Sequence, residues 1–139
     1  LGAASITSHS ALESVSALGL KYAMTPNWDP ALQLHARNLQ QLLIPGVFST
    51  TEIQQAILFG CHLIKLFPAS TLGIKYINVL RETIDSLPFL IAAGGLTIKD
   101  LSPWLEEGYG AIALGRELVK QYRVEPELNE WLQTHQYMH

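Results

Sequence analysis

A regular alternation of short apolar runs with segments of helical periodicity constrains the fold of this chain more than any other feature. The apolar runs are short and bounded by Gly, Pro or a helix start, which is typical of buried strands. They lie near residues 1–6, 20–24, 42–45, 63–67, 89–93 and 109–114. No antiparallel hairpin signal separates them. Such repetition predicts parallel strands joined by right-handed helical crossovers, so we expect six βα units of the α/β class.

Helix starts lie between the predicted strands. Side chains that can cap a first helical turn stand before four of the helical segments, namely Ser8, Asp29, Ser49-Thr50 and Thr97. They can accept hydrogen bonds from free backbone N–H groups, and Pro30 suits the first helical position after Asp29. The patterns predict helices over residues 9–18, 30–38, 50–59, 73–84, 98–107, 117–123 and 125–138.

Two architectures are compatible with six such units. The first loop, residues 3–8, lacks the G-x-G-x-x-G turn of a dinucleotide-binding doubly wound sheet, which removes the main support for that fold. A (β/α)8 barrel needs eight units and roughly 200 residues or more, whereas this chain has 139 residues. No linker or low-complexity segment divides the chain, so we expect residues 1–139 to form a single domain.

Composition argues against several classes of function. The net charge is −3 and no cluster of Lys or Arg is present, so nucleic acid and membranes are not expected partners. No apolar run approaches the length of a membrane-spanning helix. The single cysteine, Cys61, cannot form an intramolecular disulfide, which fits a reducing compartment and predicts a cytoplasmic protein. The five histidines show no metal-ligand spacing, so we expect no metal site.

Lys65 is the most unusual residue of the predicted interior. It lies in the run HLIKLFPAS, residues 62–70, with two aliphatic residues before it and Leu66 and Phe67 after it. Burial disfavours a charged amine, and a neutral amine in a dry pocket can attack a carbonyl carbon to form a Schiff base. A lysine near a strand end can also extend its ammonium group to water. The run alone leaves these two interpretations evenly balanced.

Glycines follow the last two predicted strands. Gly94-Gly95 ends the strand at 89–93, and Gly115-Arg116 ends the strand at 109–114. Glycine lets backbone N–H groups approach an anion closely, and an arginine can add a bidentate contact to phosphate oxygens. Loops after the last strands of a barrel often bind phosphate. The two turns therefore favour the interpretation that they bind phosphate over the alternative that their glycines only allow a tight turn between strand and helix.

Several segments, in collinear order over essentially the whole chain, resemble a known family. HLIKLFPAS is similar to the lysine strand of the 2-keto-3-deoxy-6-phosphogluconate and 4-hydroxy-2-oxoglutarate aldolases, class I enzymes on a (β/α)8 TIM barrel. The other similar segments are GAASI, YAMTPNWDP, LIPGVFSTTEI, IAAGGLT and ALGRELV. The K-x-F-P-A core is the most specific part. The resemblance implies that this chain supplies about the last six βα units of the barrel.

The resemblance also implies roles for individual residues. Lys65 matches the Schiff-base lysine, and Phe67 matches the aromatic residue that lines the pocket beside it. Ser5 matches a threonine that binds the pyruvate carboxylate, and Pro26 matches the proline of a turn at the site. The phosphate loops are matched by Gly94, Gly95, Gly115 and Arg116, the last of which stands where the family has serine.

Two further departures from the family pattern bear on the site. Asn27 stands where the family has glycine, and Ala93 stands where it has threonine. The family's first two βα units, which carry a proton-shuttling glutamate and a nearby arginine, match no part of this chain. We therefore expect the barrel domain to be incomplete at its N-terminus.

The function implied by the resemblance is cleavage of a 2-keto-3-deoxy-6-phospho sugar acid, or of 4-hydroxy-2-oxoglutarate, to pyruvate and an aldehyde through a lysine Schiff base. The family belongs to carbohydrate metabolism by the Entner–Doudoroff pathway. It implies no metal or organic cofactor, a small-molecule keto acid as the partner, and a homotrimer. Two alternatives stay open: a non-catalytic or degenerate phosphate-ligand-binding paralogue, and a sugar-phosphate epimerase or isomerase barrel in which Lys65 is only structural.

Overall fold

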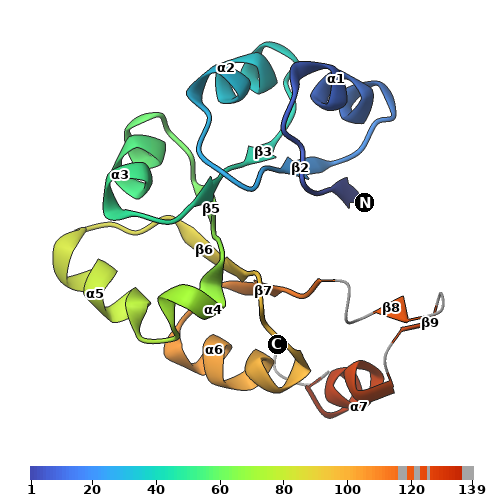
Figure 1. The fold of residues 1–139 in the computed structure, drawn as a ribbon, viewed down its shortest axis with the longest axis vertical. Helices are drawn as coiled ribbons and strands as arrows, with labels where there is room; N and C mark the ends of the chain where they lie inside the picture. Colours follow the sequence, from blue (N-terminus) through green and yellow to red (C-terminus); the bar gives the residue numbers. More distant parts are fainter. Residues whose placement is uncertain (116–118, 121–122, 125, 136–139) are drawn as a thin grey trace.

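The computed structural model of the chain describes residues 1–115, 119–120, 123–124 and 126–135 (Figure 1). The elements follow in the order β1 (Gly2–Ala3), α1 (His9–Ala17), β2 (Tyr22–Met24), α2 (Pro30–Asn38), β3 (Leu43–Ile44), β4 (Gly46–Val47), α3 (Thr50–Leu58), β5 (Leu63–Leu66), α4 (Ala69–Leu72), α5 (Tyr76–Thr83), β6 (Phe89–Ala93), the 3-10 helix η1 (Ile98–Asp100), α6 (Leu101–Glu107), β7 (Ala111–Ala113), β8 (Val119–Lys120), β9 (Arg123–Val124) and α7 (Pro126–His135).

The strands from β1 to β7 are parallel and lie in sequence order. One sheet has the order β1-β2-β3 and a second has the order β4-β5-β6-β7. Figure 1 shows them as a curved row of strands with helices α1, α2, α3 and α5 along its outer side. The prediction of parallel strands with helical crossovers is therefore confirmed for this part of the chain.

The boundary between the two sheets falls at Pro45. The sequence predicted that the strand near residues 42–45 ends at Pro45-Gly46, but the chain continues as β4. Proline has no N–H to donate. Its carbonyl oxygen nevertheless accepts a hydrogen bond of 2.8 Å from the Lys65 N–H, while the Ile44 carbonyl still bonds the Thr25 N–H at 3.1 Å. The chain thus changes its partner at Pro45, from β2 to β5.

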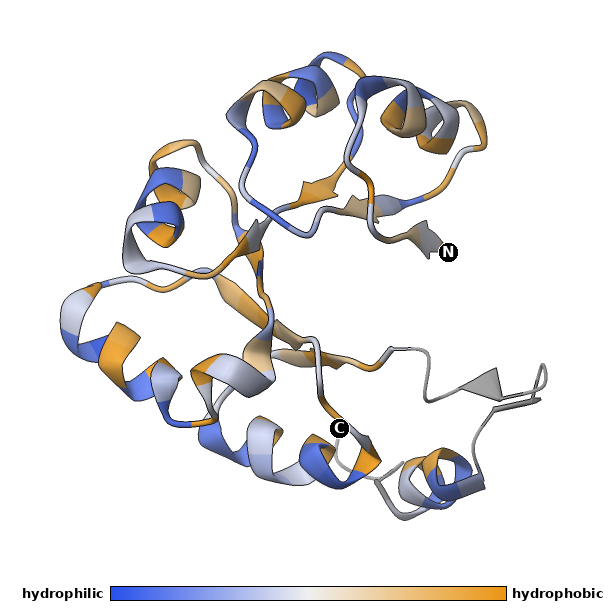
Figure 2. Cartoon of the chain, viewed as in Figure 1, coloured by the Kyte–Doolittle hydropathy of each residue, from blue (hydrophilic) through white to orange (hydrophobic). Residues whose placement is uncertain are grey.

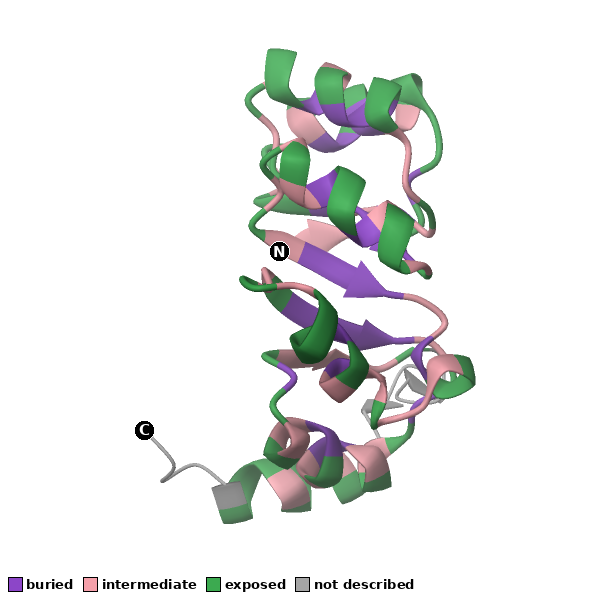
Figure 3. Cartoon of the chain, turned by 90° about the vertical axis from the view of Figure 1, so that its left-hand side faces the viewer, coloured by how far each residue is buried: buried purple, intermediate pink, exposed green. Residues whose placement is uncertain are grey.

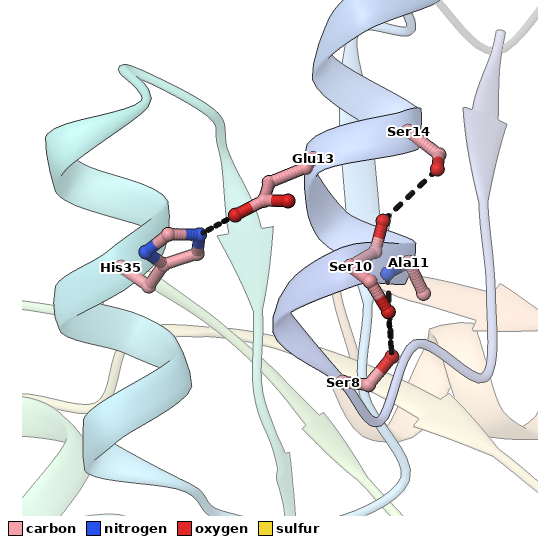
Figure 4. Close-up of polar contacts among 6 residues, drawn as sticks. All are labelled: Ser8, Ser10, Ala11, Glu13, Ser14 and His35. Atoms are coloured by element: carbon pink, nitrogen blue, oxygen red, sulfur yellow. Dashed lines mark hydrogen bonds and ion pairs between the residues drawn. The ribbon is translucent and has the colours of Figure 1, made fainter.

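Three of the four predicted helix caps are confirmed, whereas the Thr97 side chain accepts no cap hydrogen bond. The Ser8 hydroxyl accepts a hydrogen bond from the Ala11 N–H (Figure 4), and the Asp29 carboxylate accepts one from the Leu32 N–H. Ser49, rather than Thr50, caps α3 and forms a capping box with Glu52. The Glu13 carboxylate of α1 lies 3.0 Å from Nε2 of His35 in α2, and Figure 4 draws this contact as a dashed line.

The apolar core has two parts that match the two sheets. One cluster packs α1 and α2 on β2 and β3, and a larger one packs the later helices on β4, β5 and β6. The apolar faces of the helices turn toward the strands (Figure 2), and the central strands are buried (Figure 3). No helix in the described residues is long and apolar enough to cross a membrane.

Three details of local structure differ from the predictions. Residues 117–123 were predicted as a helix, but β8 and β9 occupy the described part of this stretch and pair antiparallel, with Val119 opposite Val124 in the register. The short helix α4 was not predicted, and α5 begins at Tyr76 instead of Gly73. Gly73 has a positive φ of 81°, so it ends α4 and cannot start the next helix.

Candidate functional site

A cavity of about 390 Å³ lies at the carboxyl ends of the strands. Its wall includes six of the residues singled out from the sequence: Ser5, Lys65, Phe67, Gly94, Gly95 and Gly115. These residues follow or end β1, β5, β6 and β7. The carboxyl ends of parallel strands are where α/β enzymes place their working residues, and the structure brings most of the predicted site together there.

Lys65 lies in the middle of the larger sheet. In β5 it is opposite Gly46 of β4 on one side and Ile91 of β6 on the other. Only 6% of its surface is exposed, and desolvation by burial lowers the pKa of its amine below the ordinary value for lysine. This burial disfavours the interpretation in which the ammonium group extends to water.

The surroundings of the Lys65 amine are apolar. Its Nζ lies 4.8 Å from the centroid of the Phe67 ring. Within the described part of the chain, no hydrogen bond or ion pair holds Nζ, and Lys65 is the only cavity-lining residue with an ionisable side chain. With desolvation as the cause of the pKa shift, the neutral and nucleophilic form of the amine is favoured.

Gly94 and Gly95 form a tight turn where only glycine fits easily. Their φ angles are +92° and +74°, in the region that side chains disfavour. A Cβ on Gly94 would lie 2.8 Å from the Phe67 ring, and a Cβ on Gly95 would lie 2.8 Å from Ser70 Cβ. The Ser70 N–H donates to the Gly94 carbonyl at 3.1 Å. The turn therefore packs directly against the segment that follows Lys65.

One predicted site residue, Pro26, is not in the described cavity wall, and another cannot be placed. Pro26 is half-buried in the turn after β2, and Met24 of the same strand reaches the cavity in its place. Arg116 lies outside the described residues. Ser5 reaches the wall in a left-handed conformation, with φ +61°, which is costly for a residue with a side chain.

Sequence reasoning missed several residues of the wall. Ala4, Ala113 and Leu114 are apolar residues beside strand ends, and Leu96 and Thr97 follow the glycine turn. Apart from Thr97, none has a polar side chain, so only their position near a strand end could have identified them. The N–H and the hydroxyl of Thr97 both donate hydrogen bonds to the Asp100 carboxylate, so the side chain is already engaged outside the cavity.

Another residue that the sequence did not reveal as important is Thr25. It is 2% exposed, and its hydroxyl donates to the Asn27 carbonyl at 2.6 Å and accepts from the Gly46 N–H at 3.1 Å. The sequence shows that Thr25 precedes Pro26 in the turn, but it does not show that the Thr25 hydroxyl bonds Gly46, which is 21 residues away. Of the described residues, no group of three or more His, Cys, Asp or Glu is placed to hold a metal ion.

Comparisons with known proteins identify the family of this chain. A family profile described as KDPG and KHG aldolase matches residues 1–134. The chain is 27% identical over 120 residues to 2-dehydro-3-deoxy-6-phosphogalactonate aldolase of Escherichia coli K12, and the match covers 86% of this chain and 58% of that protein. The chain spans little more than half the length of this curated relative.

Two solved structures extend the comparison. A structure described as "Native KDPGal structure" is 25% identical with a TM-score of 0.80, over 93% of this chain and 63% of that one. The KDPG aldolase of Legionella pneumophila, with pyruvate captured as a covalent carbinolamine, is 22% identical with a TM-score of 0.70, over 80% of this chain and 54% of that one. These likenesses confirm the predicted fold class, that of the barrel-type α/β aldolases, of which the chain forms a part.

Proposed function

The chain belongs to the KDPG and KHG aldolase family, and we propose that it cleaves a 2-keto-3-deoxy-6-phospho sugar acid, or 4-hydroxy-2-oxoglutarate, to pyruvate and an aldehyde through a Schiff base on Lys65. The observation that carries this proposal is a lysine that is 6% exposed and lines the cavity with its pKa lowered by burial. The pyruvate held covalently in the Legionella enzyme supports the same chemistry.

In the proposed mechanism, the neutral Lys65 amine attacks the C2 carbonyl of the keto acid. The carbinolamine loses water to give an iminium ion, which accepts the electron pair of the C3–C4 bond as that bond breaks. The C4 hydroxyl gives up its proton and leaves as the aldehyde. The resulting enamine is protonated at C3, and water then hydrolyses the imine to release pyruvate and restore the free amine.

The remaining predicted residues have supporting parts in this proposal. Ser5 would bind the carboxylate next to C2, Phe67 would exclude water beside the amine, and Pro26 would shape the wall from its turn. The turns at Gly94-Gly95 and Gly115-Arg116 would hold the distal phosphate. The reaction needs no metal or organic cofactor, because the lysine itself provides the electron sink.

We further propose that residues 1–139 are part of a longer barrel and that the proton-transfer group comes from another part of it. Two observations support this: the described cavity wall has no carboxylate or imidazole, and the matched segment covers only 58% of the curated relative. Intact-mass measurement on the protein from its source tests this, because a mass near 15.4 kDa would contradict it. Assembly as a homotrimer, checked by light scattering, is proposed from the family alone.

One observation favours a second candidate, a paralogue that binds phosphorylated keto acids without turning them over. Apart from Lys65, the described cavity wall offers only hydroxyls and backbone groups as polar contacts. Such a protein would still form the imine but would not release aldehyde. Assays of turnover with the phosphorylated keto acids named above distinguish the two candidates.

Incubation with pyruvate and borohydride, followed by peptide mass spectrometry, tests the proposed Schiff base. The unmodified protein is expected to gain a reduced pyruvate adduct at Lys65, and Lys65→Ala is expected to lose it. Lys75→Ala is the matched control, because the Lys75 side chain is 76% exposed and pairs with Glu107 on the surface. Absence of the adduct, or an adduct that persists in Lys65→Ala, would overturn the aldolase proposal.

A further inference from the structure

A buried hydroxyl fastens the turn that follows β2 to Gly46 in the next part of the chain. Thr25 Oγ1 donates to the Asn27 carbonyl at 2.6 Å, which closes the turn, and accepts from the Gly46 N–H at 3.1 Å. The residue is 2% exposed. The bond from Gly46 is buried and the bond to Asn27 is partly buried. Loss of the hydroxyl would therefore leave a buried N–H without this partner.

Gly46 receives this turn at close range. A Cβ at position 46 would lie 2.8 Å from the Asn27 N atom and would collide with the Pro26 carbonyl group. Gly46 is opposite Lys65 in the register of β4 and β5, and the preceding carbonyl, that of Pro45, accepts the Lys65 N–H at 2.8 Å. The Thr25 hydroxyl is thus separated from the backbone of Lys65 by a single strand.

This contact also lies where the two sheets divide. β2 belongs to the first sheet and β4 to the second, and the two apolar clusters are divided in the same way. The cavity wall draws Ser5 and Met24 from the first part and Lys65 from the second. A bond that crosses the division therefore helps to fix how the two sides of the cavity face each other.

We propose that Thr25 is a positioning residue of the aldolase site, whose hydroxyl holds the turn after β2 against Gly46 and so sets Lys65 opposite the wall formed by Ser5 and Met24. The proposal rests on the function proposed above. Thr25 is not in the cavity wall, so it acts through the strand beside Lys65 and not by contact with substrate. A displacement of about 1 Å at a reacting group can lower a rate roughly 100-fold.

Thr25→Val tests the proposal because valine keeps the shape of threonine but has no hydroxyl. The rate constant of pyruvate trapping by borohydride is measured across pH in the intact protein. Thr25→Val is expected to lower this rate constant roughly 10-fold or more. The pH midpoint of trapping is expected to move upward, because a looser wall admits water to Lys65, and the described wall holds no other ionisable side chain. Thr25→Ser, which keeps the hydroxyl, is expected to behave like the parent protein.

Gln33→Leu is the matched control for a general loss of stability. Gln33 is 5% exposed, and its Nε2 donates to the Leu43 carbonyl of β3 at 3.3 Å. The variant removes a buried hydrogen bond to the same stretch of chain, on the helix side and away from the cavity. It is expected to lower the melting temperature while the trapping rate constant and its pH midpoint stay unchanged.

The outcomes separate this inference from the proposed function. A parent protein without any adduct would refute the Schiff base and, with it, the role of Thr25. A parent protein that forms the adduct, with Thr25→Val matching it in rate constant and pH midpoint, would refute only the positioning role. Equal losses in Thr25→Val and Gln33→Leu would refute it as well. If Thr25→Val does not fold, Thr25→Cys takes its place under the same criteria, because a thiol is only a weak donor and acceptor.

Discussion

Substitution of Gly95 by alanine tests how closely the glycine turn approaches the segment after Lys65. The new Cβ would lie 2.8 Å from Ser70 Cβ and closer still to the Ser70 hydroxyl. The hydroxyl can rotate away, but the Ser70 Cβ is fixed by the backbone of α4. The φ of +74° at Gly95 adds conformational strain for any side chain.

The magnitude follows from these two contributions. The left-handed conformation costs alanine about 1–2 kcal/mol, and overpacking costs about 1–3 kcal/mol. Gly19→Ala isolates the first contribution, since Gly19 has a φ of +65° and a Cβ there would have no atom within 4 Å. We therefore expect Gly95→Ala to lower the free energy of unfolding by about 2–5 kcal/mol and Gly19→Ala by about 1–2 kcal/mol.

The assay is urea unfolding. It compares Gly95→Ala and Gly19→Ala with Ser70→Gly and with the double variant Gly95→Ala/Ser70→Gly. The double variant removes the opposing Cβ, so it should recover the overpacking contribution but not the conformational one. Equal losses in Gly95→Ala and Gly19→Ala would refute the close approach. If the turn also binds the distal phosphate, Gly95→Ala should raise KM for a phosphorylated keto acid more than it slows pyruvate trapping; equal effects would refute that role.

Three further predictions concern stability. Lys65→Met should raise the free energy of unfolding by about 1 kcal/mol near pH 7. Because the folded-state pKa of Lys65 is depressed, the parent protein gains stability as the pH rises toward the ordinary pKa of lysine. Urea unfolding near pH 10 should therefore show a smaller difference between Lys65→Met and the parent. Burial alone would raise the pKa of Glu52, but hydrogen bonds from Ser49 and Phe48 lower it. Glu52→Gln should therefore lower the free energy of unfolding by about 1 kcal/mol near pH 7. A loss of stability that persists in acid, below the depressed pKa, would contradict this cause. Ile64→Ala, at a fully buried position of β5, should cost about 2–5 kcal/mol in the same assay.

The sequence predicted those parts of the fold that depend on local rules. Caps such as Ser8 and Asp29 act on N–H groups three residues away, and the strand at residues 89–93 has the same bounds in the structure. Both can be recognised from a few neighbouring residues. The sequence predicted that a strand ends at Pro45 because proline has no N–H to continue the hydrogen-bond ladder to its neighbour. The Pro45 carbonyl nevertheless accepts a hydrogen bond from Lys65, which lies 20 positions later in the chain.

The site shows the same division between local and distant information. Lys65 stood out because an amine within an apolar run is unusual in any context. The role of Thr25 depends on Gly46, and the close approach at Gly95 depends on Ser70. Neither pairing leaves a pattern in a single sequence, because each joins residues from separate βα units.

The apolar surroundings of Lys65 also constrain where a proton-transfer group can act. An opposite charge within about 4–6 Å of an amine raises its pKa, so a carboxylate at that distance would oppose the lowering that burial produces at Lys65. It would favour the charged form of the amine, which does not attack the keto acid. A carboxylate that serves the proposed reaction is therefore expected to reach the C4 hydroxyl of the substrate while it stays farther from Lys65 Nζ. The described residues of the cavity wall meet this condition, because they place only hydroxyl, backbone and apolar groups around the amine.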